Sequence, residues 1–125
     1  MTGRVKPAAA AAAAGPDLYV YAATVAKVVD GDTLDLLADV GFGVTVKIRA
    51  RLVGVYAPEL GTPEGEDAAA FTRAWVEQHG PGFLVRTFHD RKERYGRYLA
   101  TVAPAAGGPG LGEALVEAGH ATTAA

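Results

Sequence analysis

Apolar and polar positions alternate along much of this chain, and this alternation predicts a protein built mainly from short strands. The segment 19–29 is rich in β-branched and aromatic residues, which favour strands. The clearest alternation comes later, where Val44, Val46 and Ile48 point one way and the polar residues between them point the other. The polar series continues to Arg51, so we expect its guanidinium on the outer face of a strand.

The same pattern predicts five strands and two helices in the order β-β-β-α-β-β-α. The predicted strands span 19–29, 33–37, 44–51, 83–88 and 97–102. Helical spacing of apolar residues predicts one helix over 66–79, which Gly80-Pro81-Gly82 ends, and a shorter one over 111–118. Five short strands with a helix between the third and the fourth match a β-rich α+β fold, the five-stranded Greek-key barrel called the OB-fold.

The first 17 residues differ in composition from the rest, because the run Ala8–Ala14 lies between two prolines. An isolated alanine helix this short is marginal in water, so we expect residues 1–17 to be a flexible tail and residues 18–125 to be one domain. A signal peptide is the alternative interpretation, since Arg4 and Lys6 precede the run. Alanine alone makes a weak hydrophobic region, which favours a cytoplasmic location over secretion.

The amino-acid composition excludes several kinds of catalytic and metal-binding site. The 125 residues include no cysteine, which excludes disulfides, thiolate metal sites and a cysteine nucleophile. No stretch approaches the roughly 20 apolar residues that cross a bilayer, so no membrane partner is expected. The net charge is −2, but the basic residues gather in the middle and later parts of the chain. This distribution favours phosphate contacts in one cleft over general binding of duplex DNA.

Three charged residues are the candidates for catalysis: Arg51, Glu59 and Arg97. They occur in the phrases Arg51-Leu-Val-Gly-Val-Tyr-Ala-Pro-Glu59 and Tyr95-Gly-Arg97. A guanidinium binds phosphate oxygens as a bidentate fork, and a carboxylate can direct a water molecule at phosphorus. The Asp-Gly-Asp turn at 30–32 offers oxygen ligands, which suit a hard cation such as calcium or magnesium. Together these residues indicate hydrolysis of a phosphodiester.

In sequence, the chain resembles the staphylococcal nuclease (thermonuclease) family over about residues 21–121. The resemblance rests on the phrases Val28–Thr33, Arg51–Glu59, Ala68–Phe71, Tyr95–Ala100 and Glu113–Gly119, in this order. It implies a calcium-dependent phosphodiesterase that cuts DNA and RNA with little sequence preference. In that family the position of Arg51 holds the scissile phosphate, that of Glu59 orients or deprotonates the attacking water, and that of Arg97 stabilises the charge on phosphorus.

The resemblance also implies a metal site and a substrate pocket. It makes Asp32 a calcium ligand with Asp30 close behind it, and the main-chain carbonyl of Ala57 a second ligand. It places Tyr95 and Arg94 at the phosphate pocket. We expect DNA and/or RNA as partners, a monomeric chain, and no small-molecule cofactor.

Each assignment has a plainer alternative. Asp32 could act only as the cap of a tight turn, and Glu59 only as a solvated loop carboxylate. The two arginines could form surface ion pairs with Asp35 or Glu93, although such pairs contribute little to stability.

The chain departs from the family at Tyr56, where active members carry a second calcium-binding aspartate. A phenol stays neutral near pH 7, and the loss of one of two anionic ligands weakens calcium binding. Three outcomes stay open: a weakly held ion completed by water and substrate, a carboxylate supplied by Glu64, Glu66 or Asp67, or a catalytically inactive OB-fold module that only binds nucleic acid. The family's third helix, with its base-stacking tyrosine, is not expected, because the chain stops at Ala125.

Overall fold

Five strands close into a barrel in the computed structural model, which describes residues 18–92 and 94–123. The strands follow one another around the barrel in the order β1-β2-β3-β6-β5, and every neighbouring pair is antiparallel except β3 and β6. Their bounds are β1 Val20–Asp30, β2 Thr33–Asp39, β3 Thr45–Leu52, β5 Phe83–Lys92 and β6 Tyr98–Pro104. The predicted OB-fold is therefore confirmed, and the predicted tail of residues 1–17 lies outside the described residues.

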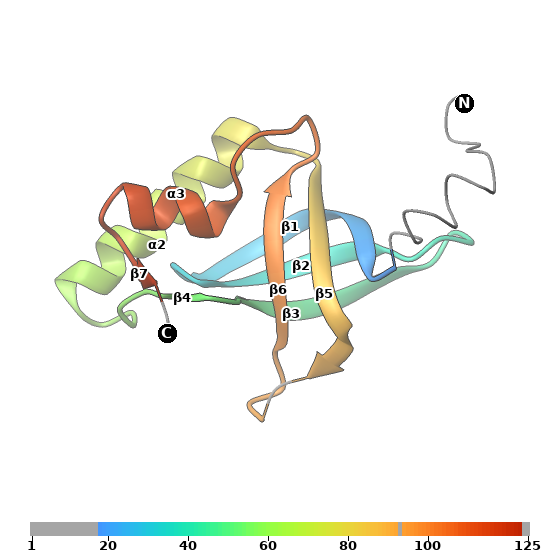
Figure 1. Cartoon of the computed structure of the whole chain (residues 1–125), viewed down its shortest axis with the longest axis horizontal. Helices are drawn as coiled ribbons and strands as arrows, with labels where there is room; N and C mark the ends of the chain where they lie inside the picture. The colour runs from blue at the N-terminus through green and yellow to red at the C-terminus, as the bar shows by residue number, and fades with distance from the viewer. Residues whose placement is uncertain (1–17, 93, 124–125) are drawn as a thin grey trace.

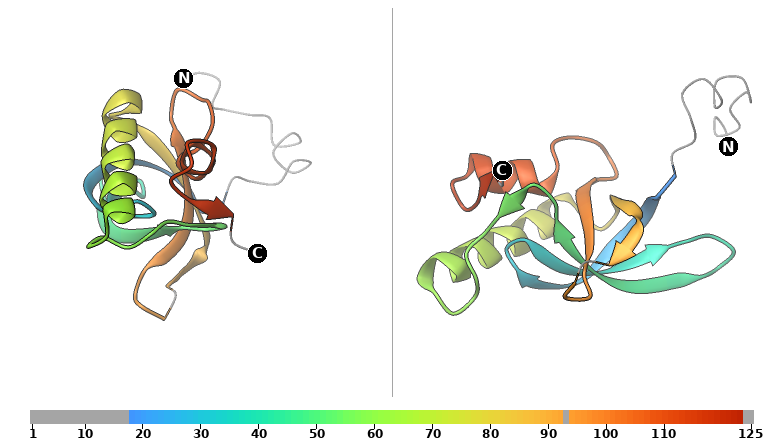
Figure 2. Two further views of the ribbon diagram at one scale, coloured as in Figure 1. Left: turned by 90° about the vertical axis from the view of Figure 1, so that its left-hand side faces the viewer. Right: turned by 60° about the horizontal axis from the view of Figure 1, so that its bottom comes forward.

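Two helices complete the predicted order, α2 over Pro63–His79 and α3 over Leu111–Glu117. Both lie at the same end of the barrel, and the hairpin between β2 and β3 extends from the other end (Figure 1, Figure 2). The β5–β6 hairpin projects to one side. The core lies inside the barrel and beneath the helices. Its largest fully buried side chains are Leu34, Leu36, Leu52, Phe83, Leu111 and Leu115.

A two-stranded sheet outside the barrel is not predicted by the sequence pattern. Strand β4, Val55–Tyr56, pairs antiparallel with β7, Thr122–Thr123. Strands of two residues show no periodicity, so only the folded chain reveals them. Val55 is buried, and because successive side chains of a strand point to opposite faces, Tyr56 points outward.

Most element boundaries differ from the prediction by one or two residues, and two larger differences have identifiable reasons. The helix α2 begins at Pro63 and not at residue 66, because Thr62 caps it by accepting a hydrogen bond from the amide of Gly65 at 2.9 Å. Strand β5 continues past Phe88 to Lys92, after a register shift in its pairing with β6. Residues 89–92, which lie outside the strand predicted over 83–88, are therefore strand in the projecting hairpin.

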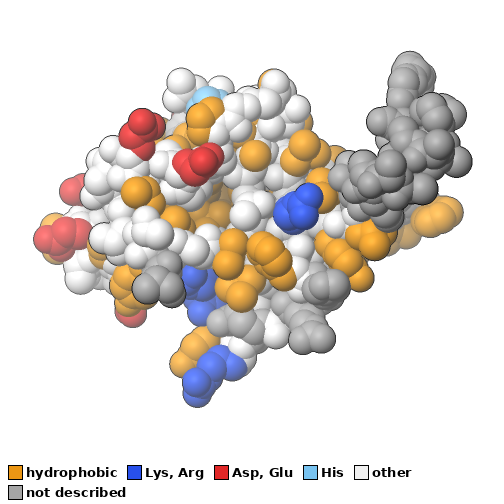
Figure 3. All heavy atoms as spheres, in the orientation of Figure 1, with side chains coloured by type: hydrophobic (Ala, Val, Ile, Leu, Met, Phe, Trp, Pro, Cys, Tyr) orange, Lys and Arg blue, Asp and Glu red, His pale blue; other side chains and the backbone are white. Residues whose placement is uncertain are grey.

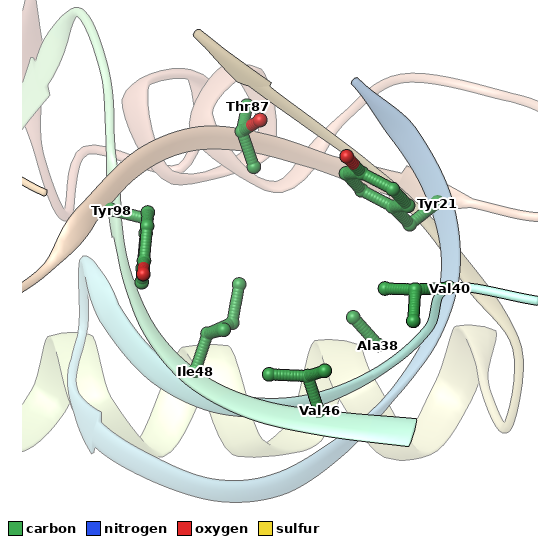
Figure 4. A pocket seen from close by; sticks show the side chains of 7 residues that line it. All are labelled: Tyr21, Ala38, Val40, Val46, Ile48, Thr87 and Tyr98. Carbon is green, nitrogen blue, oxygen red and sulfur yellow. The ribbon is translucent and has the colours of Figure 1, made fainter. Parts of the chain in front are cut away.

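The barrel encloses a small apolar pocket of about 160 Å³ near the β2–β3 hairpin. All five strands contribute, and Figure 4 shows their side chains pointing into the same space. The lining residues are Tyr21, Ala38, Val40, Val46, Ile48, Thr87 and Tyr98. The predicted apolar face of β3 is thus directed inward, although Val46 remains about two-fifths exposed where the barrel opens.

Candidate active site

A cleft of about 320 Å³ brings together all three residues predicted to be catalytic, as well as the predicted metal ligands. Its walls come from the β1–β2 turn, from β3 and β4, from the loop before α2, and from the residue preceding β6. The lining residues are Asp30, Asp32, Arg51, Tyr56, Ala57, Glu59, Leu60 and Arg97. The predicted substrate residues Arg94 and Tyr95 are not among them and lie in the adjoining β5–β6 turn.

Closure of the barrel brings the two arginines of the cleft together from neighbouring parts of the sheet. The parallel pairing of β3 with β6 sets Arg51 opposite Leu99, two residues after Arg97. The Arg51 side chain is only 18% exposed, and its Nη1 donates to the carbonyl of Leu52 at 2.7 Å. The guanidinium is therefore held in one place at the cleft wall.

Asp32 connects three parts of the cleft. Its Oδ1 accepts a hydrogen bond from the Thr33 hydroxyl at 3.1 Å, and its Oδ2 accepts one from the backbone amide of Ala57 at 3.1 Å. Nη2 of Arg51 lies 3.5 Å from the same Oδ2. These contacts reach beyond the local turn, so Asp32 does more than cap it, and its buried carboxylate faces the phosphate-binding arginine predicted from the sequence.

Helix α2 holds the β1–β2 turn in place. The buried hydroxyl of Thr72 donates to the carbonyl of Gly31 at 2.7 Å. A Cβ atom on Gly31 would lie 2.8 Å from the Cβ of Ala68, which is too close for any larger residue without a shift. The turn that carries Asp30 and Asp32 is therefore pressed against the helix.

The first turn of α2 holds the backbone of Glu59. The Thr62 hydroxyl donates to the Glu59 carbonyl at 3.0 Å, and a Cβ atom on Gly65 would collide with that same carbonyl. Thr62 and Gly65 both lie before the helix predicted over 66–79, so the sequence pattern did not identify their role. A threonine before a proline and an acidic residue is a helix N-terminal signal, and it could have identified these positioning residues.

Two exposed tyrosines lie beside the guanidinium groups of the site. The Tyr95 ring centroid is 5.4 Å from Cζ of Arg97 and 5.2 Å from Cζ of Arg94, so this ring lies within cation–π range of both. Through Arg97, Tyr95 is in contact with the cleft. The Tyr56 ring centroid is 5.9 Å from Cζ of Arg51.

The atoms in the cleft that could ligate a metal ion are all oxygens, and this ligand set fits a hard cation. Within the described ranges, no three acidic, histidine or cysteine side chains converge as a preformed metal cluster. Glu64, Glu66 and Asp67 are absent from the described lining of the cleft, and Glu66 instead faces the amide of Gly61 at 3.3 Å. A cation here would therefore take most of its ligands from water and substrate.

The alternative that Arg51 pairs with Asp35 is wrong, because Asp35 is paired with Arg49. The other alternative partner, Glu93, lies outside the described residues. Nε of Arg49 lies 2.7 Å from Oδ1 of Asp35, and Nη2 lies 3.1 Å from Oδ2. The Arg49 hydrogen bonds lower the pKa of the Asp35 carboxyl below its ordinary value. This neighbouring pair leaves Arg51 directed at the cleft.

We expect Asp35→Asn to destabilise the protein at neutral pH and to make little difference in acid. The folded protein lowers the pKa of Asp35, so its contribution is complete above the unfolded pKa of about 4 and is lost as the pH falls through the lower folded pKa. Urea unfolding of both proteins across this pH range measures the difference. Glu77→Gln, at an exposed helical carboxylate, is the control, and a pH-independent Asp35→Asn effect would contradict the assignment.

The fold and the cleft define a class: a small β-barrel protein with a charged cleft that two arginines and three carboxylates line. The chain belongs to the staphylococcal nuclease family, because the family model described as staphylococcal nuclease homologue matches residues 49–125. This match includes Arg51, Glu59 and Arg97, and the structure adds the earlier turn with Asp32 to the same cleft. A comparison with curated proteins found no match. None of the helices in the described part of the chain is long and apolar enough to span a membrane.

Proposed function

We propose that this protein is a cation-dependent phosphodiesterase that hydrolyses DNA or RNA by attack of water on phosphorus. The observation that carries the proposal is the convergence of Arg51, Glu59 and Arg97 on one cleft. A carboxylate beside two phosphate-binding groups would oppose simple binding of an anion, but it suits activation of water. Membership of the staphylococcal nuclease family supports the same activity.

In the proposed mechanism, Arg51 binds the scissile phosphate through its fixed guanidinium. Glu59 orients a water molecule and takes its proton as the water oxygen bonds to phosphorus. The ester bond opposite the water then breaks, the departing oxygen takes a proton from solvent water, and Glu59 returns its own proton to solvent. Arg97 stabilises the charge that grows on the other phosphate oxygens, where a preorganised donor is most effective.

We further propose calcium as the cation, held weakly by Asp32 and the carbonyl of Ala57, with Asp30 close by. When bound, the ion would neutralise charge on the phosphate. Tyr56 lines the cleft where the family has a second anionic ligand, and its side chain supplies no carboxylate to the site. This feature also favours the second candidate function, binding of nucleic acid without cleavage.

Cleavage of single-stranded DNA should require calcium, and Tyr56→Asp should lower the calcium concentration needed for half-maximal cleavage by about tenfold or more. The reason is that ligand charge tunes calcium affinity over orders of magnitude. Gel analysis of fragments across a calcium titration measures the activity, and calorimetric titration with calcium measures binding directly.

The chelator-treated protein is the control in this experiment, and Tyr56→Asn is the matched variant that changes shape without adding charge. A gel shift without fragments at any calcium concentration would support the binding module over the enzyme. Equal calcium affinities for Tyr56→Asp and Tyr56→Asn would exclude this cleft as the calcium site.

A further inference from the structure

We infer that Tyr56 binds a nucleobase adjacent to the scissile phosphate, so that the residue in the place of a metal ligand serves as a substrate-binding residue. The inference rests on the proposed function and identifies what recognises the part of the substrate beyond the phosphate. It gives Tyr56 a positive role in the site.

The backbone around Tyr56 fixes the direction of its ring. Val55 is buried in the core, and the pairs Val55–Thr123 and Tyr56–Thr122 hold β4 against β7. The opposite face of this short strand is the cleft, and Tyr56 lines it while remaining 57% exposed. A large aromatic side chain thus stands at the edge of the cleft with much of its surface accessible to a ligand.

The chemistry around Tyr56 suits a nucleotide better than a free phosphate. Leu60 also lines the cleft and is 42% exposed, so an apolar rim adjoins the charged groups Arg51, Glu59 and Arg97. Inorganic phosphate has no apolar surface to place on such a rim. A nucleic acid bound through its phosphate has a flat base next to it, and every base can stack on an aromatic ring.

The two exposed tyrosines, Tyr56 and Tyr95, differ in the number of guanidinium groups near their rings. The Tyr95 ring centroid lies within 5.4 Å of Cζ of both Arg94 and Arg97, so two guanidinium groups already compete with a base for this ring. Tyr56 lies near one guanidinium, that of Arg51, at the longer distance of 5.9 Å. The arginine that binds the phosphate and the ring that takes the base are therefore neighbours. A base can reach this ring only when it is unstacked from a duplex, which costs energy.

Binding of two probes with equal charge tests the inference. One probe is a fluorescent oligothymidylate, and the other is an oligomer of abasic sugar phosphates with the same number of phosphates. All proteins carry Glu59→Gln so that the probes stay intact, and fluorescence anisotropy measures affinity. Tyr56→Ala should weaken binding of oligothymidylate by about tenfold and leave binding of the abasic oligomer within about twofold. Tyr56→Phe should keep the affinity of the parent for both.

Arg51→Ala separates this inference from the proposed function. It should weaken both probes, because both offer the same phosphates. If Tyr56→Ala changes the affinity for neither probe, or changes both affinities equally, the inference is overturned. A loss of affinity in Arg51→Ala would then still support phosphate binding in the cleft. If the parent binds neither probe, both the inference and the proposed function fail. Thermal unfolding of each variant confirms that the barrel remains folded.

Discussion

A Glu59→Gln variant is expected to hydrolyse nucleic acid roughly 10²–10⁴ times more slowly than the native protein while keeping its fold. The amide preserves the size of the side chain but cannot accept the proton of the attacking water. Arg97→Ala should produce a loss of roughly 10²–10³, since it removes a donor aimed at the growing charge on phosphorus. Initial rates of oligonucleotide cleavage at saturating calcium measure both effects.

Exposed residues of the same types provide the controls. Glu117→Gln, at the end of α3, and Arg86→Ala, on the outside of β5, should leave the rate unchanged. Circular dichroism should show the same barrel in all four variants. A native rate in Glu59→Gln would remove this carboxylate from the mechanism and return it to the role of a solvated loop residue.

The second large effect is expected at a residue outside the described lining of the cleft, in Gly65→Ala. The added methyl group would collide with the carbonyl of Glu59, so the loop that carries the proposed base must move. Because misplacement of a catalytic group by about 1 Å can cost 10²-fold, we expect kcat to fall by roughly that factor. The added group should also lower the free energy of unfolding by about 1–3 kcal/mol, as overpacking does. Steady-state kinetics and urea unfolding measure the two effects.

Gly112→Ala is the matched control, because it adds the same methyl group to a helical glycine. There the Cβ would lie 3.5 Å from a methyl group of Val55, which is an ordinary contact, and alanine favours helix. The control should be slightly more stable and fully active. If Gly65→Ala also kept full activity, the first turn of α2 would not be what positions Glu59.

The barrel itself could be predicted from the sequence because its strands carry a strong period-two pattern. The alternation around Val46 and Ile48 identified β3, and the breaks at Gly80-Pro81-Gly82 separated α2 from β5. The pattern failed where the fold depends on tertiary contacts. The two-residue strands β4 and β7 have no period, and the extension of β5 depends on its partner β6.

The candidate site shows the same division between local and tertiary information. Motifs identified Arg51, Glu59 and Arg97 individually, since each residue type has a chemistry that can be read from the chain. No local pattern shows that Asp32 accepts a hydrogen bond from Ala57, which is 25 residues away. Local patterns also do not show that Gly65 packs against the backbone of Glu59. The only trace of this contact in the sequence is the glycine itself.

The parallel register of β3 and β6 has a consequence for how this protein is made. Arg51 and Arg97 are neighbours only because Arg51 lies opposite Leu99, and β6 is the last of the five barrel strands in the chain. A nascent polypeptide in which β6 is not yet made would have Arg51 in place but not Arg97. With the proposed roles, such an unfinished chain would lack the group that stabilises the charge on phosphorus, so the proposed site is complete only after β6 has been synthesised and has paired with β3.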